Sequence, residues 1–258
     1  MKNNPMVSTM ERIGINEIKY MDCVEGLKRY VADKSVNHFY ADPPFGIDFT
    51  KTESMYNRKK KYVVKGYTEP MRYRDFTLQW VKECYRVLKN DGTGFICSGW
   101  TNLADVLWAI DQAGFTVVNH IIWKYNFGVY TKKKFVTSHY HILFVAKGKN
   151  WTFRKDCRHS DVRDKEGNDN YRDREDVWLI NRPYRRGEEK NANTQPENLV
   201  EKALDYTTNV GDLVLDPFAG GGTTAVVCKK MRRNFIGFEI NSEMKELIER
   251  RLNDVTPR

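Results

Sequence analysis

The chain has 258 residues, of which 40% are hydrophobic and 30% are charged, enough apolar content for one large globular core. It carries 43 Lys and Arg against 34 Asp and Glu, a formal net charge of +9, which favours an acidic partner such as nucleic acid. No apolar run approaches the about 20 residues that cross a bilayer, and residues 1–10 show no apolar secretory signal, so we expect neither a membrane protein nor a secreted one.

The cysteine pattern indicates a reducing compartment. The chain has five cysteines, none in a C-x-x-C pair and none joined by a histidine cluster: Cys23, Cys84, Cys97, Cys157 and Cys228. This spacing predicts neither a zinc site nor a disulfide framework, and we expect a cytoplasmic protein without a metal.

Strand and helix patterns alternate along the chain. Strands are predicted at 15–21, 36–42, 94–98, 116–124, 139–147, 213–216 and 235–240. Helices are predicted at 22–31, 76–88, 102–113, 196–206, 223–231 and 242–252, the second ending before the turn signal Asn90-Asp91-Gly92. This alternation predicts an α/β fold: a doubly wound, mostly parallel seven-stranded sheet with helices on both faces. Because no helix separates 116–124 from 139–147, we expect these two strands to form an antiparallel pair at one edge.

Two polar stretches interrupt this rhythm within what we predict to be a single domain, 1–258. Residues 46–70 mix tyrosines with a basic run, Arg58-Lys59-Lys60-Lys61, which suits a mobile loop that grips phosphates. Residues 150–190 are dense in Arg and Asp, and their arginines are candidate DNA contacts. The alternative for both stretches is a solvated surface loop whose arginines pair with neighbouring carboxylates.

The late glycine turn, residues 216–224, follows a predicted strand and precedes a predicted helix. Gly220 and Gly222 let the backbone bend and let a ligand come close. Glu239 follows about 20 residues later at the end of the next strand, where a carboxylate can hold ribose hydroxyls. Without a G-K-[ST] sequence the turn fits a phosphate poorly, whereas Asp216 fits a cationic group. These features predict a nucleoside site; the alternative is a tight strand-to-helix turn.

The early motif, Asp42-Pro43-Pro44-Phe45, also follows a predicted buried strand. The exocyclic amine of a base is a poor nucleophile, and acceptors for its protons favour a tetrahedral nitrogen. Asp42 and the Pro43 carbonyl can be these acceptors, the two prolines stiffen the corner, and Phe45 offers a face for a flipped-out base. The alternative is a strand-ending turn with Phe45 in the core.

In this order the two motifs resemble the permuted β class of amino-methylating DNA methyltransferases, in which the catalytic motif precedes the cofactor motif. The resemblance runs from about residue 15 to residue 252 and is weakest in the two polar stretches. It implies S-adenosylmethionine as cofactor, double-stranded DNA as partner, and a target-recognition role for 150–190. Asp22 would then meet the adenine ring of the cofactor, Phe218 would pack against it, and Glu239 would bind its ribose. The cofactor-binding residues implied are Asp22, Asp216, Phe218, Gly220, Gly222, Thr223, Glu239 and Thr194; the catalytic residues are Asp42, Pro43, Pro44 and Phe45.

The chain departs from the family pattern at two positions. Gly221 stands where the family often has Ser, with little expected effect because the backbone carries the role. In the segment before residue 197, Gln195 stands where an ungapped alignment places the family's Lys. Thr194 or the helix N-terminus beside Pro196 could replace the lost cation.

Asp42 favours adenine as the target base, since related cytosine-N4 enzymes usually open this motif with Ser. The resemblance thus predicts a site-specific adenine-N6 DNA methyltransferase that acts after base flipping. Alternatives are a cytosine-N4 DNA enzyme, an RNA adenine methylase, a non-catalytic nucleic-acid-binding module and a dinucleotide-dependent oxidoreductase. A homodimer and a cognate restriction endonuclease are further partners that the family allows.

Overall fold

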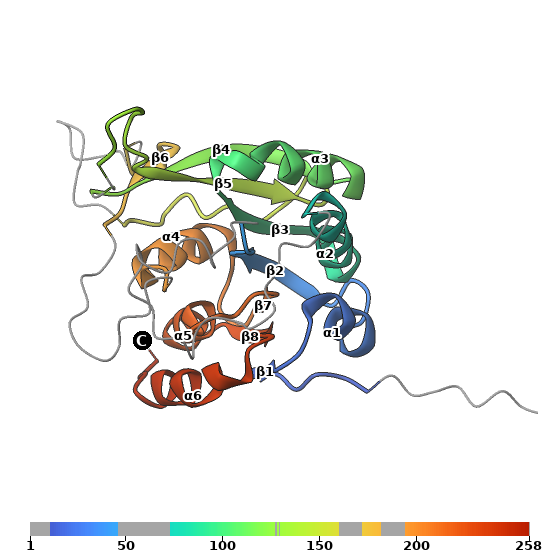
Figure 1. Ribbon diagram of the computed structural model, residues 1–258. Helices are drawn as coiled ribbons and strands as arrows, with labels where there is room; N and C mark the ends of the chain where they lie inside the picture. Colours follow the sequence, from blue (N-terminus) through green and yellow to red (C-terminus); the bar gives the residue numbers. More distant parts are fainter. Residues whose placement is uncertain are drawn as a thin grey trace, which may run out of the picture.

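The computed structural model describes residues 11–45, 73–126, 128, 130–159, 172–181 and 194–257. Within them the strands form one eight-stranded sheet in the order β1-β8-β7-β2-β3-β5-β4-β6 (Figure 1). The strands are β1 (Glu17–Lys19), β2 (Val36–Ala41), β3 (Leu88–Ser98), β4 (Thr116–Lys124), β5 (His139–Ala146), β6 (Val177–Leu179), β7 (Leu213–Asp216) and β8 (Asn234–Phe238). The α-helices are α1 (Cys23–Tyr30), α2 (Tyr73–Val87), α3 (Leu103–Ala113), α4 (Glu197–Thr207), α5 (Thr223–Lys230) and α6 (Lys245–Asn253).

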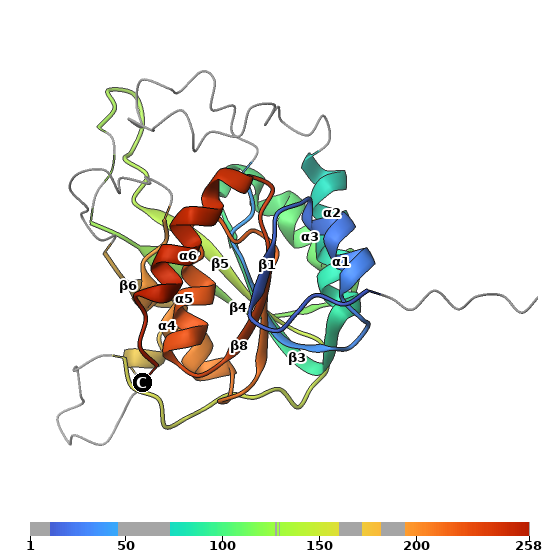
Figure 2. The ribbon, with the colours of Figure 1, turned by 90° about the horizontal axis from the view of Figure 1, so that it is seen from below.

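The sheet separates two layers of helices. Helices α1, α2 and α3 cover one face, and α4, α5 and α6 cover the other (Figure 2). Successive side chains of β2 therefore enter different cores: Phe39 packs with residues of α1 and α2, whereas Tyr40 packs with residues of α4 and α5. Because both faces are covered, the central strands are hydrophobic on both sides.

The centre of the sheet brings the two motif-bearing strands together. β2 pairs in parallel with β3 on one side and with β7 on the other, with Phe39 opposite Leu215. β2 and β7 therefore end at the same sheet edge, although their last residues, Ala41 and Asp216, are 175 positions apart in the sequence. Open α/β sheets bind ligands at this carboxyl edge, where the chain order along the sheet reverses.

The structure confirms the predicted α/β class and corrects two details. The sheet has eight strands among the described residues, because β6 lies within the stretch 150–190, where no strand was predicted. Three residues are too short for a periodic signal. The predicted antiparallel pairing of 116–124 with 139–147 is confirmed by β4 and β5. The pair does not form the edge, because β6 adds in parallel to the far side of β4 and β5 lies between β3 and β4.

The turn predicted at Asn90-Asp91-Gly92 is wrong. These residues lie inside β3, which begins at Leu88 directly after α2. The sequence signal instead marks an irregularity in pairing, because Val36 lies opposite Leu88 but His38 lies opposite Thr93. Asp91 has a φ of 60° there, a backbone conformation that Asp tolerates better than most residues.

One of the two polar stretches lies wholly outside the described residues, and the other lies partly outside them. Residues 46–70 lie outside the described residues, and of 150–190 only 150–159 and 172–181 are described. None of the helices in the described part of the chain has the length and apolar character needed to cross a membrane.

Candidate active site

The predicted catalytic corner, residues 42–45, leaves the carboxyl end of β2. Asp42 is half-buried, Pro43 is buried, and Phe45 is half-buried. The Phe45 ring packs against Tyr140 of β5, with ring centroids 5.3 Å apart and planes inclined by 45°. Tyr140 in turn contacts Tyr125, at 5.5 Å, so the corner borders a wall of aromatic rings. Tyr125 directly follows β4, so the end of this strand contributes to the same wall.

Beneath the corner lies a buried polar triangle. Tyr40, two residues before Asp42 on the same face of β2, donates a 2.7 Å hydrogen bond from its hydroxyl to Gln195 Oε1. Gln195 Nε2 donates to Cys97 Sγ of β3 at 3.3 Å, and the Tyr40 hydroxyl lies 3.5 Å from the same sulfur. The triangle ties β2, β3 and the residue pair that precedes α4 into one unit below Asp42.

Asp216 begins the glycine turn at the end of β7. Its side chain is 8% exposed, and Oδ1 accepts a 2.9 Å hydrogen bond from the Phe218 backbone N–H. Burial raises the pKa of Asp216 to about 7, against the effect of hydrogen bonds from Thr224 and Phe218, and the negative charges of Asp42 and Glu239 raise it further. The carboxylate form of Asp216 therefore favours a cation beside it.

Glu239, the residue after β8, closes the glycine turn. Its Oε2 accepts a 2.7 Å hydrogen bond from the Gly220 backbone N–H, and its Oε1 accepts a 2.8 Å bond from the Asn241 N–H. Burial raises the pKa of Glu239. Gly220 and Gly222 have φ values of 50° and 74°, which residues with a Cβ rarely adopt. The two glycines thus give the turn a shape that points its backbone N–H toward the next strand.

Phe218 packs against two aromatic side chains of α2. Its ring meets Trp80 of α2 edge-on, with centroids 5.2 Å apart and an angle of 89°. Phe76 contacts the same ring at 6.2 Å. Such edge-to-face pairs hold an aromatic ring in one orientation. The ring is half-buried, so a part of it remains available to a ligand.

The other three predicted cofactor residues are Asp22, Thr223 and Thr194. Asp22 caps α1, because its Oδ1 accepts a 3.0 Å hydrogen bond from the Glu25 N–H. Burial raises the pKa of the Cys23 thiol, and the charges of Asp22 and Glu239 raise it further. Thr223 faces α6, since its Oγ1 accepts a 3.2 Å hydrogen bond from Arg251. Thr194 is half-buried directly before Gln195.

These positions have the chemistry to bind a nucleoside with a cationic group. Three carboxylates, those of Asp42, Asp216 and Glu239, lie along the carboxyl edge of neighbouring strands and interact electrostatically. A buried carboxylate surrounded by further negative charge is suited to an ammonium or sulfonium ligand, and the half-buried ring of Phe218 is suited to an apolar or aromatic part. The residues present therefore fit S-adenosylmethionine. The described residues contain no cluster of three or more His, Cys, Asp or Glu side chains able to hold a metal ion.

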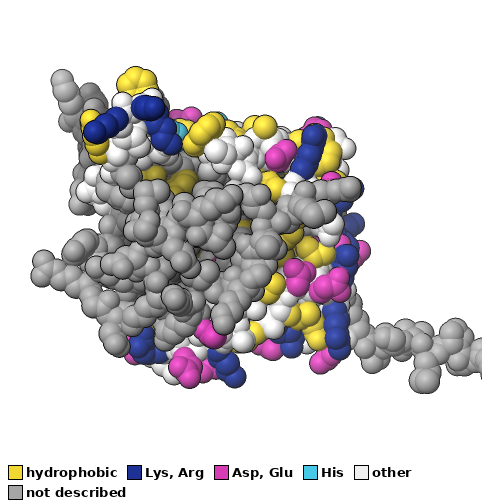
Figure 3. Space-filling view, in the orientation of Figure 1, with side chains coloured by type: hydrophobic (Ala, Val, Ile, Leu, Met, Phe, Trp, Pro, Cys, Tyr) yellow, Lys and Arg dark blue, Asp and Glu magenta, His cyan; other side chains and the backbone are white. Residues whose placement is uncertain are grey.

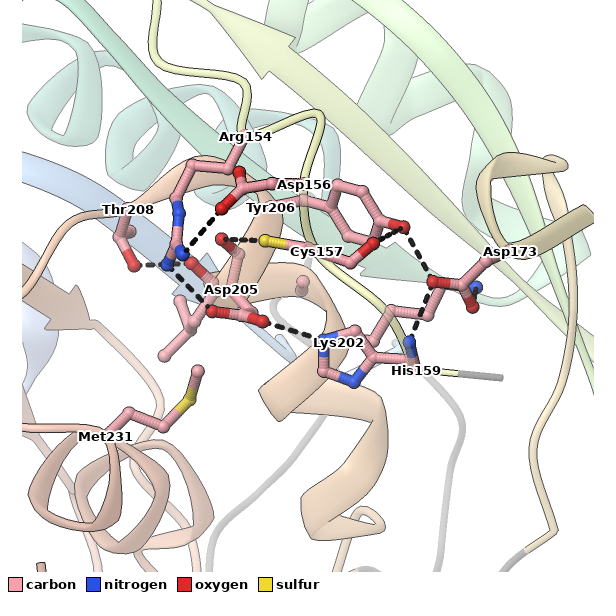
Figure 4. A network of polar contacts seen from close by, with 12 residues as sticks. Arg154, Asp156, Cys157, His159, Asp173, Lys202, Asp205, Tyr206, Thr208 and Met231 are labelled. Carbon is pink, nitrogen blue, oxygen red and sulfur yellow. Dashed lines mark hydrogen bonds and ion pairs between the residues drawn. The ribbon is translucent and has the colours of Figure 1, made fainter. Parts of the chain in front are cut away.

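A second polar cluster connects the two described parts of the 150–190 stretch, 150–159 and 172–181, to α4 (Figure 4). Asp173, 2% exposed, accepts hydrogen bonds from the Tyr206 hydroxyl at 2.6 Å and from the His159 backbone N–H at 2.8 Å, and pairs with Lys202 at 3.4 Å. Arg154 pairs with Asp205 at 3.0 Å. Arg154, which we considered as a DNA contact, is thus engaged within the fold. It also pairs with its neighbour Asp156 at 3.5 Å, which is the kind of pairing that the surface-loop alternative expected.

The sequence pattern did not predict the contributions of Tyr40, Trp80 and Asp173. Tyr40 and Trp80 carried only a hydrophobic signal, because their roles arise from contacts with residues far along the chain. Gln195 was noted as a lost cation, and that departure was the one available signal. Its amide is a buried partner of Tyr40 rather than an exposed ligand residue.

Comparisons with known proteins agree with this site. A family model described as DNA methylase matches residues 36–250. The type II methyltransferase M.HinfI of Haemophilus influenzae is 28% identical over 265 aligned residues, which cover 94% of this chain and 70% of that protein. An M1.HpyAVI–SAM complex superposes with a TM-score of 0.66 at 23% identity, covering 92% of this chain and 98% of that one. The cytosine-N4-specific PvuII DNA methyltransferase superposes with a TM-score of 0.65 at 17% identity, covering 95% of both chains.

The chain belongs to this DNA methylase family, because the match spans most of its length. The predicted enzyme class is therefore confirmed: the protein is a DNA methyltransferase that takes its methyl group from S-adenosylmethionine. The structural similarities, all below 25% identity, show that the fold is shared.

Proposed function

We propose that the enzyme methylates the exocyclic N6 amine of adenine in double-stranded DNA, at a specific site and after flipping the base. The observation that carries this proposal is Asp42 at the end of β2, at the same sheet edge as the glycine turn after β7. Related cytosine-N4 enzymes usually begin the corner with Ser, whereas Asp suits adenine. Because a cytosine-specific enzyme shares the fold, the side chain at position 42, not the fold, favours adenine.

Each residue of the corner has a proposed role. The Asp42 carboxylate accepts a hydrogen bond from one N–H of the target amine, and the backbone carbonyl of Pro43 accepts a hydrogen bond from the other N–H. Both contacts strengthen as positive charge develops on the nitrogen, so they stabilise the transition state more than the ground state. Pro44 keeps the corner rigid, and Phe45, held against Tyr140, stacks on the flipped base. Asp42 then accepts or relays the proton that the methylated amine releases.

The proposed cofactor residues surround the glycine turn. When bound, S-adenosylmethionine supplies an electrophilic methyl group. Asp216 holds its ammonium group, Glu239 its ribose hydroxyls and Phe218 an apolar face, while Gly220 and Gly222 allow close approach of the backbone. Asp22, Thr194 and Thr223 are included on the strength of the family resemblance.

The proposal extends to the organisation of the enzyme. The motif order places it in the permuted β class, as a single domain over 1–258 with 46–70 as the catalytic-side loop and 150–190 as the recognition stretch. The family resemblance also favours action in the cytoplasm, beside a cognate restriction endonuclease and as a homodimer.

Nucleoside mass spectrometry tests the proposed base. The purified protein is incubated with unmethylated genomic DNA and S-adenosylmethionine, and the DNA is then digested and sequenced with detection of modified bases. N6-methyladenine in one recurrent sequence is expected. N4-methylcytosine would overturn the adenine assignment, and methylation of RNA alone would overturn the DNA duplex as substrate.

A further inference from the structure

The connection between β4 and β5 carries an exposed tip that none of the site assignments uses. Lys132, Lys133 and Lys134 are all exposed and follow one another directly. Phe135 beside them is 99% exposed, and Tyr130 is 79% exposed. In Figure 3 basic and apolar side chains gather at the upper left, over this connection. None of the three lysines forms an ion pair with another residue in the part of the chain that the structure describes.

The arms of the connection are ordered against each other. The Tyr125 backbone N–H donates to the Ser138 carbonyl at 3.0 Å, which closes the foot of the hairpin. Higher up, a Cβ placed on Gly128 would lie only 2.1 Å from Val136 Cγ1, so the two arms touch there. Near the end, the Thr131 hydroxyl donates to the Lys134 carbonyl at 2.7 Å. These contacts hold the lysines and Phe135 together at the tip of a hairpin.

The hairpin rises beside the catalytic corner. β4 and β3 are both antiparallel to β5, so β4 ends at the same carboxyl edge of the sheet as β2 and Asp42. Its foot is formed by Tyr125 and by the residues before Tyr140, the two rings that continue the wall behind Phe45. A substrate that places a base against Phe45 therefore extends toward this hairpin.

We propose that residues 130–135 form a contact for duplex DNA next to the target base, in which the three lysines bind backbone phosphates and Phe135 stacks against bases. Three adjacent cations suit the spaced negative charges of a phosphate backbone. A fully exposed phenylalanine among them suits a base face, since aromatic side chains stack on bases with little dependence on sequence. The proposal rests on the proposed DNA substrate and adds to it a segment outside the sequence ranges 46–70 and 150–190.

The test compares two triple variants of the full-length protein. The tip variant is K132Q/K133Q/K134Q. The control variant, K34Q/K89Q/K149Q, removes the same charge from exposed lysines at the opposite edge of the sheet, where β2 and β3 begin and β5 ends. The affinity for a fluorescent random-sequence DNA duplex is measured as a function of salt concentration. In a plot of log binding constant against log salt concentration, the slope for the tip variant is expected to be shallower by about 2 to 3. Each lost phosphate contact reduces the magnitude of this slope by about 0.9.

The role of Phe135 is separated by F135A and F135W. F135A is expected to bind the duplex about tenfold more weakly with an unchanged salt dependence, and F135W to restore the affinity. Wild-type salt dependence in the tip variant, or an equal loss in the control variant, would overturn the proposal. Methylation of DNA by the wild-type protein is measured in parallel, so that failure of the DNA substrate itself is distinguished from failure of the hairpin contact.

Discussion

The hydroxyl of Tyr40 donates a 2.7 Å hydrogen bond to the side-chain carbonyl of Gln195, which lies 155 residues further along the chain. Tyr40 lies on β2 two residues before Asp42, and Gln195 lies two residues before Glu197, the first residue of α4. The bond therefore connects the strand that precedes the predicted catalytic corner to the residues before α4, the helix that Arg154 and Asp173 contact. It is buried, so neither partner can exchange it for water.

Tyr40→Phe should lower the free energy of unfolding by about 1–2 kcal/mol, because the buried Gln195 oxygen loses its donor. It should also reduce kcat while the affinity for S-adenosylmethionine is kept, since Asp42 is less firmly positioned. Tyr206→Phe is the matched control: it also removes a buried hydroxyl that donates a hydrogen bond, here to Asp173, but away from the corner. Equal kcat losses in the two variants would show that Tyr40 has no specific effect on the corner.

Asp42→Ala should abolish methyl transfer, with kcat reduced by at least about 100-fold, because the amine of the target base loses its charged acceptor. Cofactor binding, followed by calorimetry, should persist because the glycine turn is intact. Asp42→Asn keeps an acceptor oxygen without the charge and should retain intermediate activity. Normal turnover by the Ala variant would contradict the proposed mechanism.

The affinity for S-adenosylmethionine should depend on pH through Asp216. Burial raises the pKa of Asp216 to about 7, so the folded protein without ligand keeps this proton at a pH where an unfolded Asp has lost it. The resulting contribution to stability is present below about pH 4 and is lost as the pH rises through 7. An ammonium group selects the carboxylate, and the affinity should therefore fall roughly tenfold for each pH unit below 7.

Asp216→Asn provides the control for this titration. The variant should bind the cofactor weakly and with an affinity that no longer changes between about pH 5.5 and pH 7. Calorimetric titrations at several pH values measure both curves. A wild-type affinity that stays constant over this range would mean that Asp216 does not hold the cationic group.

Asp173→Ala should destabilise the fold by about 3 kcal/mol, because it leaves the Lys202 ammonium, the Tyr206 hydroxyl and a backbone N–H without their acceptor. Urea unfolding measures the change. Asp156→Ala, which removes a 77%-exposed carboxylate 3.5 Å from Arg154, should cost less than about 0.5 kcal/mol.

The Asp173 contribution should itself depend on pH. Burial raises the pKa of Asp173, but hydrogen bonds from Tyr206 and His159 and the charge of Lys202 outweigh burial and leave the pKa below its usual value. A carboxyl group with a lowered pKa stabilises the fold above about pH 4, and this contribution is lost as the pH falls further. The difference in unfolding free energy between wild type and Asp173→Ala should therefore shrink in acid. A difference that stays constant down to about pH 2 would contradict a charged role for Asp173.

The sequence by itself determined the local features of this protein. Strand-ending motifs placed Asp42 and Asp216 at the ends of β2 and β7, and glycine patterns placed the turn at Gly220 and Gly222. These signals are local, because they depend on backbone conformation and on the hydrophobic pattern of the adjoining strand. The alternation of strands and helices likewise fixed the α/β class before any contact was known.

Only the tertiary structure decided which of these features meet. The pairing of β2 with β7 brings Asp42 into electrostatic contact with Asp216, and the packing of α2 places Trp80 against Phe218. The partnership of Tyr40 with Gln195 and the insertion of β5 between β3 and β4 also lack a local signal. Their physical basis is the burial of polar groups and strand edges that need partners, and a chain can supply those partners from any distance along its sequence.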